Sequence, residues 1–219
     1  MAGAVLRVEN AGLKYQAPEG ETVVFENISF SANQGEIISI VGPSGCGKST
    51  LLSVIAGLLP HAAGDVYIDE KKKTGISPKI GYMLQRDNLL EWRTVLSNVL
   101  FGLEIRGVKN AENIDRARAL LHKYGLSSFE DKYPRQLSGG MRQRVSLIRT
   151  LAAGPEILLL DETFSALDYQ TRLNVTEDVY GILKNENVTA LMVTHDIPES
   201  ISMGDKVMIL SAQTDGRYL

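Results

Sequence analysis

The first third of the chain alternates short apolar runs with turns rich in Gly, Pro and Asn. Runs of this kind, bounded by turn residues, are typical of β-strands. A helix-like segment at 48–56 follows a strand that leads directly into glycine. The strands that we predict here cover residues 6–9, 23–25, 28–32, 37–41, 65–68 and 80–83.

Helical spacing replaces this pattern between residues 94 and 153. Val95, Val99 and Leu103 fall on one helix face, and similar apolar sets recur around Leu120 and Ile148. Strands and helices alternate in the remainder, which predicts a parallel α/β sheet. We expect strands over 157–160, 189–193 and 206–210, and helices over 170–183 and 198–202.

Composition narrows the class of protein. The 219 residues are 44% hydrophobic, enough for one good core, and the net charge of -3 gives no overall attraction to nucleic acid. The longest apolar runs fall short of the roughly 20 residues that a membrane span needs. We see no secretory signal at the N-terminus, and the single Cys46 excludes an intrachain disulfide. These features predict a cytoplasmic location.

A phosphate-binding loop is predicted where the strand 37–41 ends. In the pattern G-x-x-x-x-G-K-[ST], glycines let backbone N–H groups surround phosphate, Lys48 reaches the β and γ oxygens, and Ser49 is placed to ligate Mg²⁺. A solvated glycine turn is the alternative, and the full motif between strand and helix argues against it. The loop reads Gly42-Pro43-Ser44-Gly45-Cys46-Gly47-Lys48-Ser49-Thr50.

Cys46 lies inside this loop, among N–H donors that can lower a thiol pKa and favour redox sensing. We favour the simpler interpretation, a small residue that fits the loop. Alkylation of Cys46 is then expected to block nucleotide binding through the bulk of the added group.

The strand 157–160 ends in two carboxylates, Asp161 and Glu162. Acidic groups beside a core are costly unless they are paired, and Mg²⁺ supplies the missing positive charge. Asp161 would hold the metal ion or its water shell, while Glu162 would polarise the water that attacks the γ-phosphate. A helix-capping Asp is the structural alternative, and the neighbouring phosphate loop favours the metal site.

A second glycine turn, Leu137-Ser138-Gly139-Gly140-Met141, precedes another predicted helix. Backbone N–H groups at a helix start attract anionic phosphate. The chain therefore carries two phosphate-binding turns, whereas kinases, GTPases and helicases share only the first.

These motifs, taken together and in this order, resemble those of the ATP-binding-cassette (ABC) ATPases over nearly the whole chain. The resemblance implies an α/β fold with a RecA-like P-loop core, an N-terminal antiparallel β lobe and an inserted helical subdomain. Within a single domain 1–219, residues 1–85 would form the β lobe and the phosphate-loop part of the core, 86–155 the helical subdomain and 156–219 the rest. The motifs beyond the phosphate loop and acidic strand are Gln85, Leu137-Ser138-Gly139-Gly140-Met141, Ser165-Ala166-Leu167-Asp168 and Thr194-His195-Asp196.

The family pattern also implies that two subunits pair head to tail when ATP binds. Ser138, Gly139 and Gly140 of one subunit would then contact the γ-phosphate held by Lys48 of the other. The second glycine turn is thereby explained as half of the partner's active site.

Four further residues receive roles from the resemblance. Gln85 would lie beside Mg²⁺, Asp168 at the dimer interface, His195 against the γ-phosphate, and Tyr15 against adenine. Taken singly, each has an ordinary explanation as a surface, loop, capping or core residue. Their order behind two phosphate motifs favours the nucleotide roles.

The segment between Gln85 and Val95 predicts a partner surface. It contains Leu89, Leu90 and Trp92, an apolar mixture that we expect to be exposed as an anchor for a docking helix. The alternative is that Trp92 fills the core of the helical lobe. The resemblance favours a groove for integral membrane permease subunits, and indirectly a solute-binding protein outside the membrane.

The sequence looks like the nitrate, sulfonate and taurine branch of bacterial importers in three places. These are parts of this segment, of the second glycine turn and of the run after His195. The sequence departs from the wider family at Met141, where Gln is commoner, at Thr163, where Pro is usual, and at Glu91. None of these changes removes a phosphate donor or a catalytic carboxylate, so we expect ATPase activity. The protein would lie at the inner face of the cell membrane.

Two other functions share a phosphate loop. A soluble cassette ATPase that acts on nucleic acid or ribosomes typically has two cassettes, a coiled coil or a basic extension, which this sequence lacks. A small-molecule kinase would leave the second glycine turn unexplained.

Overall fold

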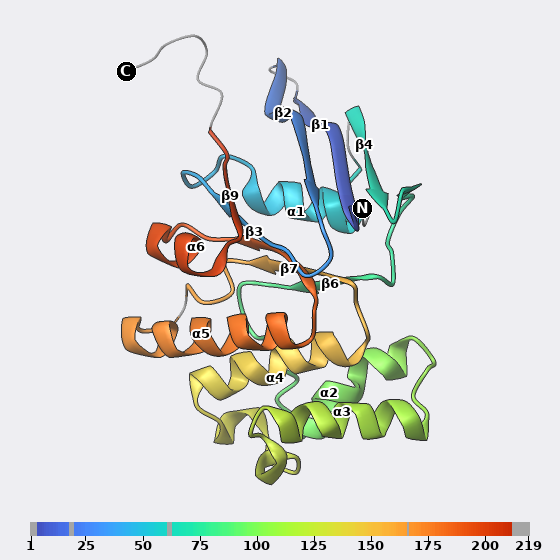
Figure 1. Ribbon diagram of the computed structural model, residues 1–219, viewed down its shortest axis with the longest axis vertical. Helices are drawn as coiled ribbons and strands as arrows, with labels where there is room; N and C mark the ends of the chain where they lie inside the picture. The colour runs from blue at the N-terminus through green and yellow to red at the C-terminus, as the bar shows by residue number, and fades with distance from the viewer. Residues whose placement is uncertain (1–3, 18–19, 61–62, 166, 212–219) are drawn as a thin grey trace.

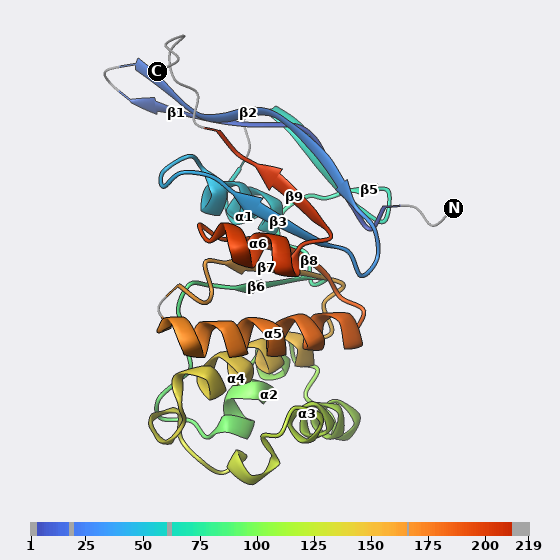
Figure 2. The same cartoon turned by 60° about the vertical axis from the view of Figure 1, so that its left-hand side comes forward.

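The computed structural model describes residues 4–17, 20–60, 63–165 and 167–211. Figure 1 shows an antiparallel sheet at one end, a parallel sheet in the middle and a group of helices at the other end. Figure 2 shows the same layers from another side, with α1 between the two sheets and α5 on the opposite face of the parallel sheet. No helix in these described ranges is long and apolar enough to cross a bilayer.

The antiparallel sheet has the strand order β2-β1-β4-β5. The predicted strands 23–25 and 28–32 are wrong as separate elements, since both belong to β2. The strand 6–9 is likewise only the start of β1. Register shifts between Val8 and Lys14, together with positive φ angles at Asn10 and Asn27, break the alternation of apolar positions, so one long hairpin reads as fragments. The strands are β1 Leu6–Ala17, β2 Gly20–Ala32, β4 Ala63–Ile68 and β5 Lys71–Lys72.

The second sheet has the order β6-β7-β8-β3-β9, and all of its pairings are parallel. The apolar runs predicted these strands closely, because strands buried on both faces, such as β3, β7 and β8, are almost continuously hydrophobic. Because all five run the same way, their carboxyl ends meet at one edge, where α/β proteins bind ligands. The strands are β3 Ile37–Val41, β6 Ile80–Met83, β7 Ile157–Asp161, β8 Thr189–Val193 and β9 Lys206–Ile209.

The parallel sheet separates two hydrophobic clusters. Ile40 and Leu159 face α1 and the antiparallel sheet, whereas Leu158 and Leu160 face the helices on the other side. The helix 48–56 is confirmed as α1, and the apolar periodicity between 94 and 153 is confirmed as three helices and two short 3-10 turns. The helices are α1 Lys48–Ala56, α2 Val95–Ile105, α3 Ala111–Lys123, α4 Gly139–Ala152, α5 Tyr169–Asn185 and α6 Ile197–Met203.

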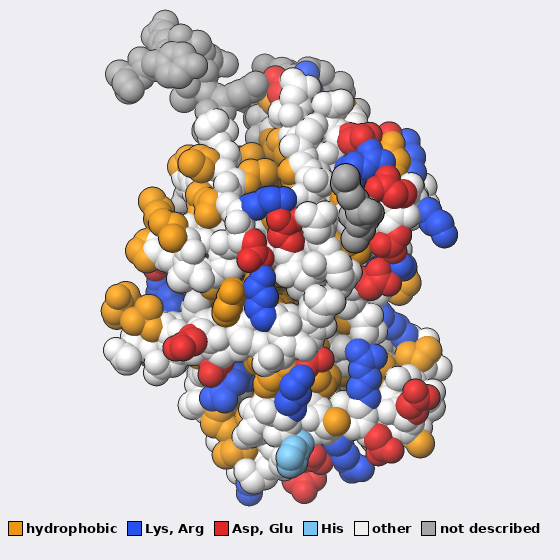
Figure 3. Space-filling model, viewed as in Figure 1, with side chains coloured by type: hydrophobic (Ala, Val, Ile, Leu, Met, Phe, Trp, Pro, Cys, Tyr) orange, Lys and Arg blue, Asp and Glu red, His pale blue; other side chains and the backbone are white. Residues whose placement is uncertain are grey.

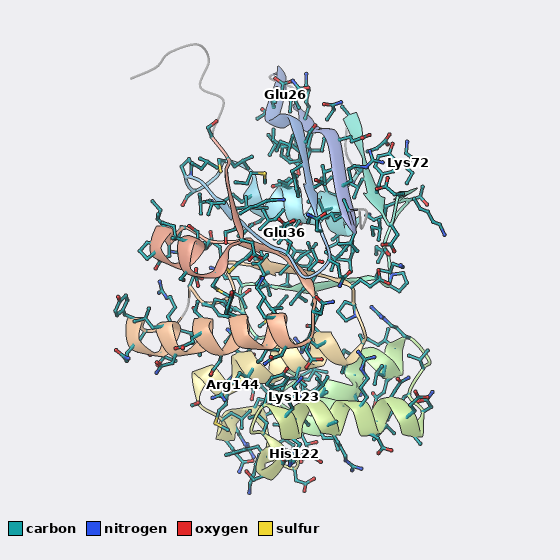
Figure 4. The ribbon with its side chains drawn as sticks, viewed as in Figure 1. Glu26, Glu36, Lys72, His122, Lys123 and Arg144 are labelled. Atoms are coloured by element: carbon teal, nitrogen blue, oxygen red, sulfur yellow. The ribbon has the colours of Figure 1, made fainter. Side chains whose placement is uncertain are left out.

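Helices α2, α3 and α4 fall within the predicted subdomain 86–155, but their hydrophobic cluster continues into α5 and the parallel sheet. Ion pairs also join the helices to α5 and its C-cap: Arg144 lies 3.5 Å from Asp178, and Lys123 lies 2.7 Å from Glu186, the residue after α5. Figure 4 shows Lys123 and Arg144 just below α5. The boundaries at 85 and 155 stay a prediction.

Candidate functional site

The phosphate loop connects β3 to α1. Gly47 precedes α1 with a φ of 96°, a left-handed conformation that glycine adopts without strain, and no side chain caps the helix. A Cβ at Gly42 would collide with the carbonyl oxygen of Leu210, so this position needs glycine for a close approach of two backbones. The N–H groups at the start of α1 consequently have no side-chain acceptor.

Lys48 is buried in the loop, where its Nζ donates to the carbonyl oxygens of Gly42 and Pro43 at 2.9 Å each. Cys46 is also buried, so alkylation of its thiol requires the loop to open, a condition that the sequence did not predict. A cavity of about 190 Å³ lies over the loop and includes a carboxylate from the end of β7. It is lined by Ser44, Gly45, Gly47, Lys48, Ser49, Thr50 and Glu162.

Ser49 and Asp161 meet at the carboxyl edge of the parallel sheet. The Ser49 hydroxyl donates to Oδ1 of Asp161 at 2.7 Å, and the Tyr82 hydroxyl donates to Oδ2 at 3.1 Å. Burial raises the pKa of Tyr82 to about 12, so this phenol remains a donor at neutral pH. Within the described residues, no three His, Cys, Asp or Glu side chains gather to hold a metal ion. A hydroxyl beside a carboxylate suits Mg²⁺ when phosphate oxygens complete the coordination.

Glu162 follows Asp161 with a φ of 44°, rare for a residue with a side chain. Its backbone N–H donates to the Val193 carbonyl at 3.0 Å, which fixes the turn against the end of β8. The Glu162 Oε2 lies 3.7 Å from Nδ1 of His195, whose ring is half exposed. A carboxylate and an imidazole therefore face each other beside the phosphate loop.

Gln85 is connected to the same acidic turn. Its Nε2 donates to Oγ of Ser165 at 3.1 Å, and that hydroxyl donates to the Glu162 carbonyl oxygen at 2.8 Å. Asp168 caps α5 by accepting from the Thr171 N–H at 3.0 Å, and its hydrogen bonds to Thr171 lower the pKa of Asp168. Ala166, part of the predicted motif, lies outside the described residues.

The β1–β2 hairpin borders the phosphate loop, since Val24 and Phe25 lie 3.0 and 3.3 Å from a Cβ built on Gly47. Tyr15 is on β1 with half of its surface exposed. Its ring is accessible, and its contact with adenine stays a prediction.

The second glycine turn starts α4. The Ser138 hydroxyl accepts from the Met141 N–H at 3.3 Å, and Gly140 is buried so closely that a Cβ would lie 2.8 Å from Val175. Met141 packs against the hydrophobic cluster of the helices, which accounts for an apolar residue where Gln is commoner. In the part of the chain that the structure describes, no hydrogen bond connects Ser138, Gly139 or Gly140 to the phosphate loop 42–50.

An ionic network that sequence reasoning missed fixes the segment 86–91 to α4. Arg142 contacts both oxygens of Asp87 at 2.8 and 3.2 Å and reaches Glu91 at 2.7 Å. Arg149 donates to the backbone oxygens of Asp87 and Asn88 at 2.7 Å each. Two arginines seven residues apart on one helix face were the available signal. This ion pair with Arg142 explains why Glu91 stands where the sequence departs from the wider family.

The apolar residues of this segment divide between core and surface. Leu89 is only 7% exposed and packs in the core, so its predicted exposure is wrong; it follows an Asn88 turn with positive φ that directs the chain inward. Trp92 is 74% exposed, which excludes the alternative that it fills the lobe's core. Thr163, the third departure, leaves a buried hydroxyl with no hydrogen-bond partner.

Comparison with known proteins agrees with this geometry. Residues 25–165 match the family model described as ABC transporter. The chain is 46% identical over 208 residues to the ABC transporter ATP-binding protein YtlC of Bacillus subtilis, covering 95% of this chain and 80% of the relative. It is 40% identical to the taurine import ATP-binding protein TauB of Escherichia coli O157:H7, covering 89% and 76%.

The nitrate import ATP-binding protein NrtD of Synechocystis is 38% identical, covering 95% of this chain and 78% of the relative. Relatives named for two different solutes share the cassette at almost the same identity. The chain therefore belongs to the ABC transporter family, as one of its ATP-binding ATPases.

Proposed function

We propose that this chain is the ATPase subunit of an importer for a small oxyanion of the nitrate, sulfonate or taurine class. The resemblance to TauB and NrtD supports an importer of this branch. The single observation that carries the hydrolytic role is Glu162, held 3.7 Å from His195 at the mouth of the phosphate-loop cavity.

ATP is proposed to bind along the loop 42–50, with Tyr15 stacked on adenine. The N–H groups at the uncapped start of α1 attract phosphate, and Lys48 exchanges its two carbonyl acceptors for phosphate oxygens. Ser49, Asp161 and Gln85 would hold Mg²⁺, which when bound neutralises charge that develops on the phosphates.

Hydrolysis is assigned to two groups. Glu162 accepts a hydrogen bond from the attacking water and orients it in line with the γ-phosphate. His195, whose Nδ1 lies 3.7 Å from the same carboxylate, is proposed to contact the γ-phosphate. Both side chains are partly exposed, so water reaches the site before closure.

Closure is proposed to require a second subunit. Ser138, Gly139 and Gly140 lie at a helix start whose dipole attracts phosphate, yet no hydrogen bond joins them to the chain's own phosphate loop within the described residues. A head-to-tail homodimer supplies them from the partner, with Asp168 at the interface. This arrangement predicts ATPase activity that rises more steeply than linearly with enzyme concentration.

The membrane partner is proposed to dock on Trp92, at the surface of the segment between Gln85 and Val95. A cleft of about 430 Å³ lies nearby between this segment and the start of α4. In the cell the protein would reside on the cytoplasmic face of the membrane, bound through permease subunits, with a solute-binding protein as an indirect partner. Figure 3 shows positive and negative side chains interspersed over one face, which supports a partner other than nucleic acid.

Glu162→Gln tests the hydrolytic role. The loss of a general base lowers kcat by about a hundredfold or more, measured as phosphate release, while ATP binding persists. Glu177→Gln, an exposed carboxylate on α5, is the matched control and leaves the rate unchanged. A normal turnover rate in Glu162→Gln would remove Glu162 from this role.

Capture from host membranes tests the transport role. The tagged chain is expected to copurify with integral membrane permease subunits, and Trp92→Ala reduces their yield. Ile76→Ala is the control. Ile76 is also exposed, at 72%, but it follows β5 of the antiparallel sheet and is not part of the segment between Gln85 and Val95. Recovery of ribosomes or nucleic acid in place of membrane proteins would favour the soluble cassette function.

A further inference from the structure

Arg172, in the first turn of α5, contacts two separate turns with one side chain. Its Nη2 donates to the carbonyl oxygens of Leu167 at 3.0 Å and Ser165 at 3.4 Å. Its Nη1 lies 3.6 Å from Oδ2 of Asp196, and the two side chains are 21% and 24% exposed. In Figure 1 the start of α5 and helix α6, which Asp196 caps, lie on the same side of the molecule.

These two turns carry the pair to which hydrolysis is assigned. Ser165 belongs to the turn after Glu162 and donates to the Glu162 carbonyl oxygen at 2.8 Å. Asp196 directly follows His195. The guanidinium of Arg172 therefore bridges the peptide segments that hold Glu162 and His195, although it touches neither side chain.

Asp196 is well placed to pass this contact to His195. Its Oδ1 accepts from the Glu199 N–H at 3.1 Å, and its own N–H donates to the Thr194 hydroxyl at 3.0 Å. The residues on both sides of His195 are thus fixed. The remaining carboxylate oxygen of Asp196 faces Arg172.

The chemistry of the guanidinium suits a bridge. Its planar fork directs N–H groups toward two acceptor sets at once, which the single ammonium of lysine does not reproduce. The Nε of Arg172 is buried without a hydrogen-bond partner. An unsatisfied buried donor lowers stability, so the conformation is not optimised for folding alone.

We propose that Arg172 is a positioning residue for ATP hydrolysis, which holds the His195 turn at its working distance from the Glu162 turn. This inference rests on the roles proposed for Glu162 and His195. Its loss lets the two turns separate, so turnover falls while the phosphate loop and its affinity for ATP are unaffected.

Arg172→Gln, Arg172→Lys and Asp196→Asn form the test, with ATP affinity, kcat and thermal unfolding measured for each. Asn is as good a helix cap as Asp, so Asp196→Asn removes the charge that faces Arg172 and keeps α6 capped. We expect Arg172→Gln to lower kcat roughly ten- to a hundredfold, because small displacements of catalytic groups are costly. ATP affinity stays within about twofold.

The double variant decides whether Arg172 acts through Asp196. Effects that share one interaction are not additive, so Arg172→Gln with Asp196→Asn is expected to be no slower than Arg172→Gln alone. Arg172→Lys should recover less than half of the lost rate. Multiplicative losses in the double variant, or a loss of ATP affinity equal to that of kcat, would overturn the proposal.

Two controls separate this inference from the proposed function. Arg118→Gln, on α3, breaks an ion pair with Glu130 at 3.4 Å and is expected to leave kcat unchanged. If Glu162→Gln hydrolyses ATP at the normal rate, the proposed hydrolytic role of Glu162 and His195 is wrong, regardless of the result for Arg172. If Glu162→Gln is inactive but Arg172→Gln is normal, only the positioning role fails.

Discussion

Helices α1 and α4 both begin at glycine-containing turns, but they satisfy their first N–H groups differently. Gly47 at α1 offers no side chain, whereas Ser138 at α4 accepts from the Met141 N–H. Lys48 lies under the first turn, and Arg142 and Asp87 brace the second. The first turn combines uncapped N–H groups with a buried lysine, while the second is a capped helix whose position depends on the neighbouring segment.

The largest effect is expected when the cation of the first turn, Lys48, is removed. Lys48→Ala is expected to weaken ATP binding by about thirty- to a hundredfold, since charge-assisted hydrogen bonds contribute roughly 1.5 to 3 kcal/mol each. Nucleotide titration of the purified protein measures the change. Lys71→Ala, an exposed lysine on β5, is the control. Unchanged affinity in Lys48→Ala would mean that α1 binds phosphate without its lysine.

Gly140→Ala tests the packing of the second turn. The added Cβ would lie 2.8 Å from Val175, so overpacking outweighs the gain in helix propensity and the free energy of unfolding falls by about 1 to 2 kcal/mol. Denaturant unfolding gives the value. Gly139→Ala is the matched variant: its Cβ lies 3.2 Å from Leu167 at an exposed position, and we expect stability to stay within about 0.5 kcal/mol. Equal losses in both variants would contradict this account.

Ser138→Ala removes the cap of α4 and should lower the free energy of unfolding by about 1 kcal/mol. Ser138→Asn keeps a cap and is expected to restore stability. If the hydroxyl serves only the helix, Asn also restores ATPase activity. Activity that stays low in Ser138→Asn would support the proposed contact with the partner's ATP.

The smallest effect depends on pH. Burial opposes ionisation of Asp87, but its hydrogen bonds with Arg142 and the Leu89 N–H keep the pKa of Asp87 below the ordinary 3.8. A lowered folded-state pKa stabilises the fold fully above pH 3.8, and this contribution is lost as pH falls through the folded value. The stability difference between the natural protein and Asp87→Asn should therefore be constant near neutral pH and shrink below pH 3.8. A difference that grows in acid would contradict the ion pair.

The sequence predicted those parts of the molecule whose pattern is local. The helix 48–56 and strands 37–41, 80–83 and 189–193 match the observed elements, because glycine turns and continuous apolar runs mark their ends. The β1–β2 hairpin was divided wrongly because its bulges interrupt the period of two. Local motifs also predicted that Ser49 and Asp161 serve one Mg²⁺ ion, and the structure brings these two side chains to 2.7 Å from each other.

Contacts between distant segments were beyond such reasoning. Leu89 is buried although the three residues before it are polar, since the Asn88 turn carries it inward. The spacing of Arg142 and Arg149 marks one helix face, but it does not give their partners at Asp87, and no spacing gives the Arg172 bridge. Roles that depend on a second subunit, such as that of Ser138, stay predictions for the same reason.

The burial of Cys46 makes the reactivity of its thiol a measure of how often the phosphate loop opens. Cys46 is the chain's single cysteine and is 4% exposed, so a thiol reagent modifies it only in molecules whose loop has opened. The labelling rate then reports the frequency of loop opening, without any introduced probe. A nucleotide that holds the loop closed should lower the labelling rate of Cys46.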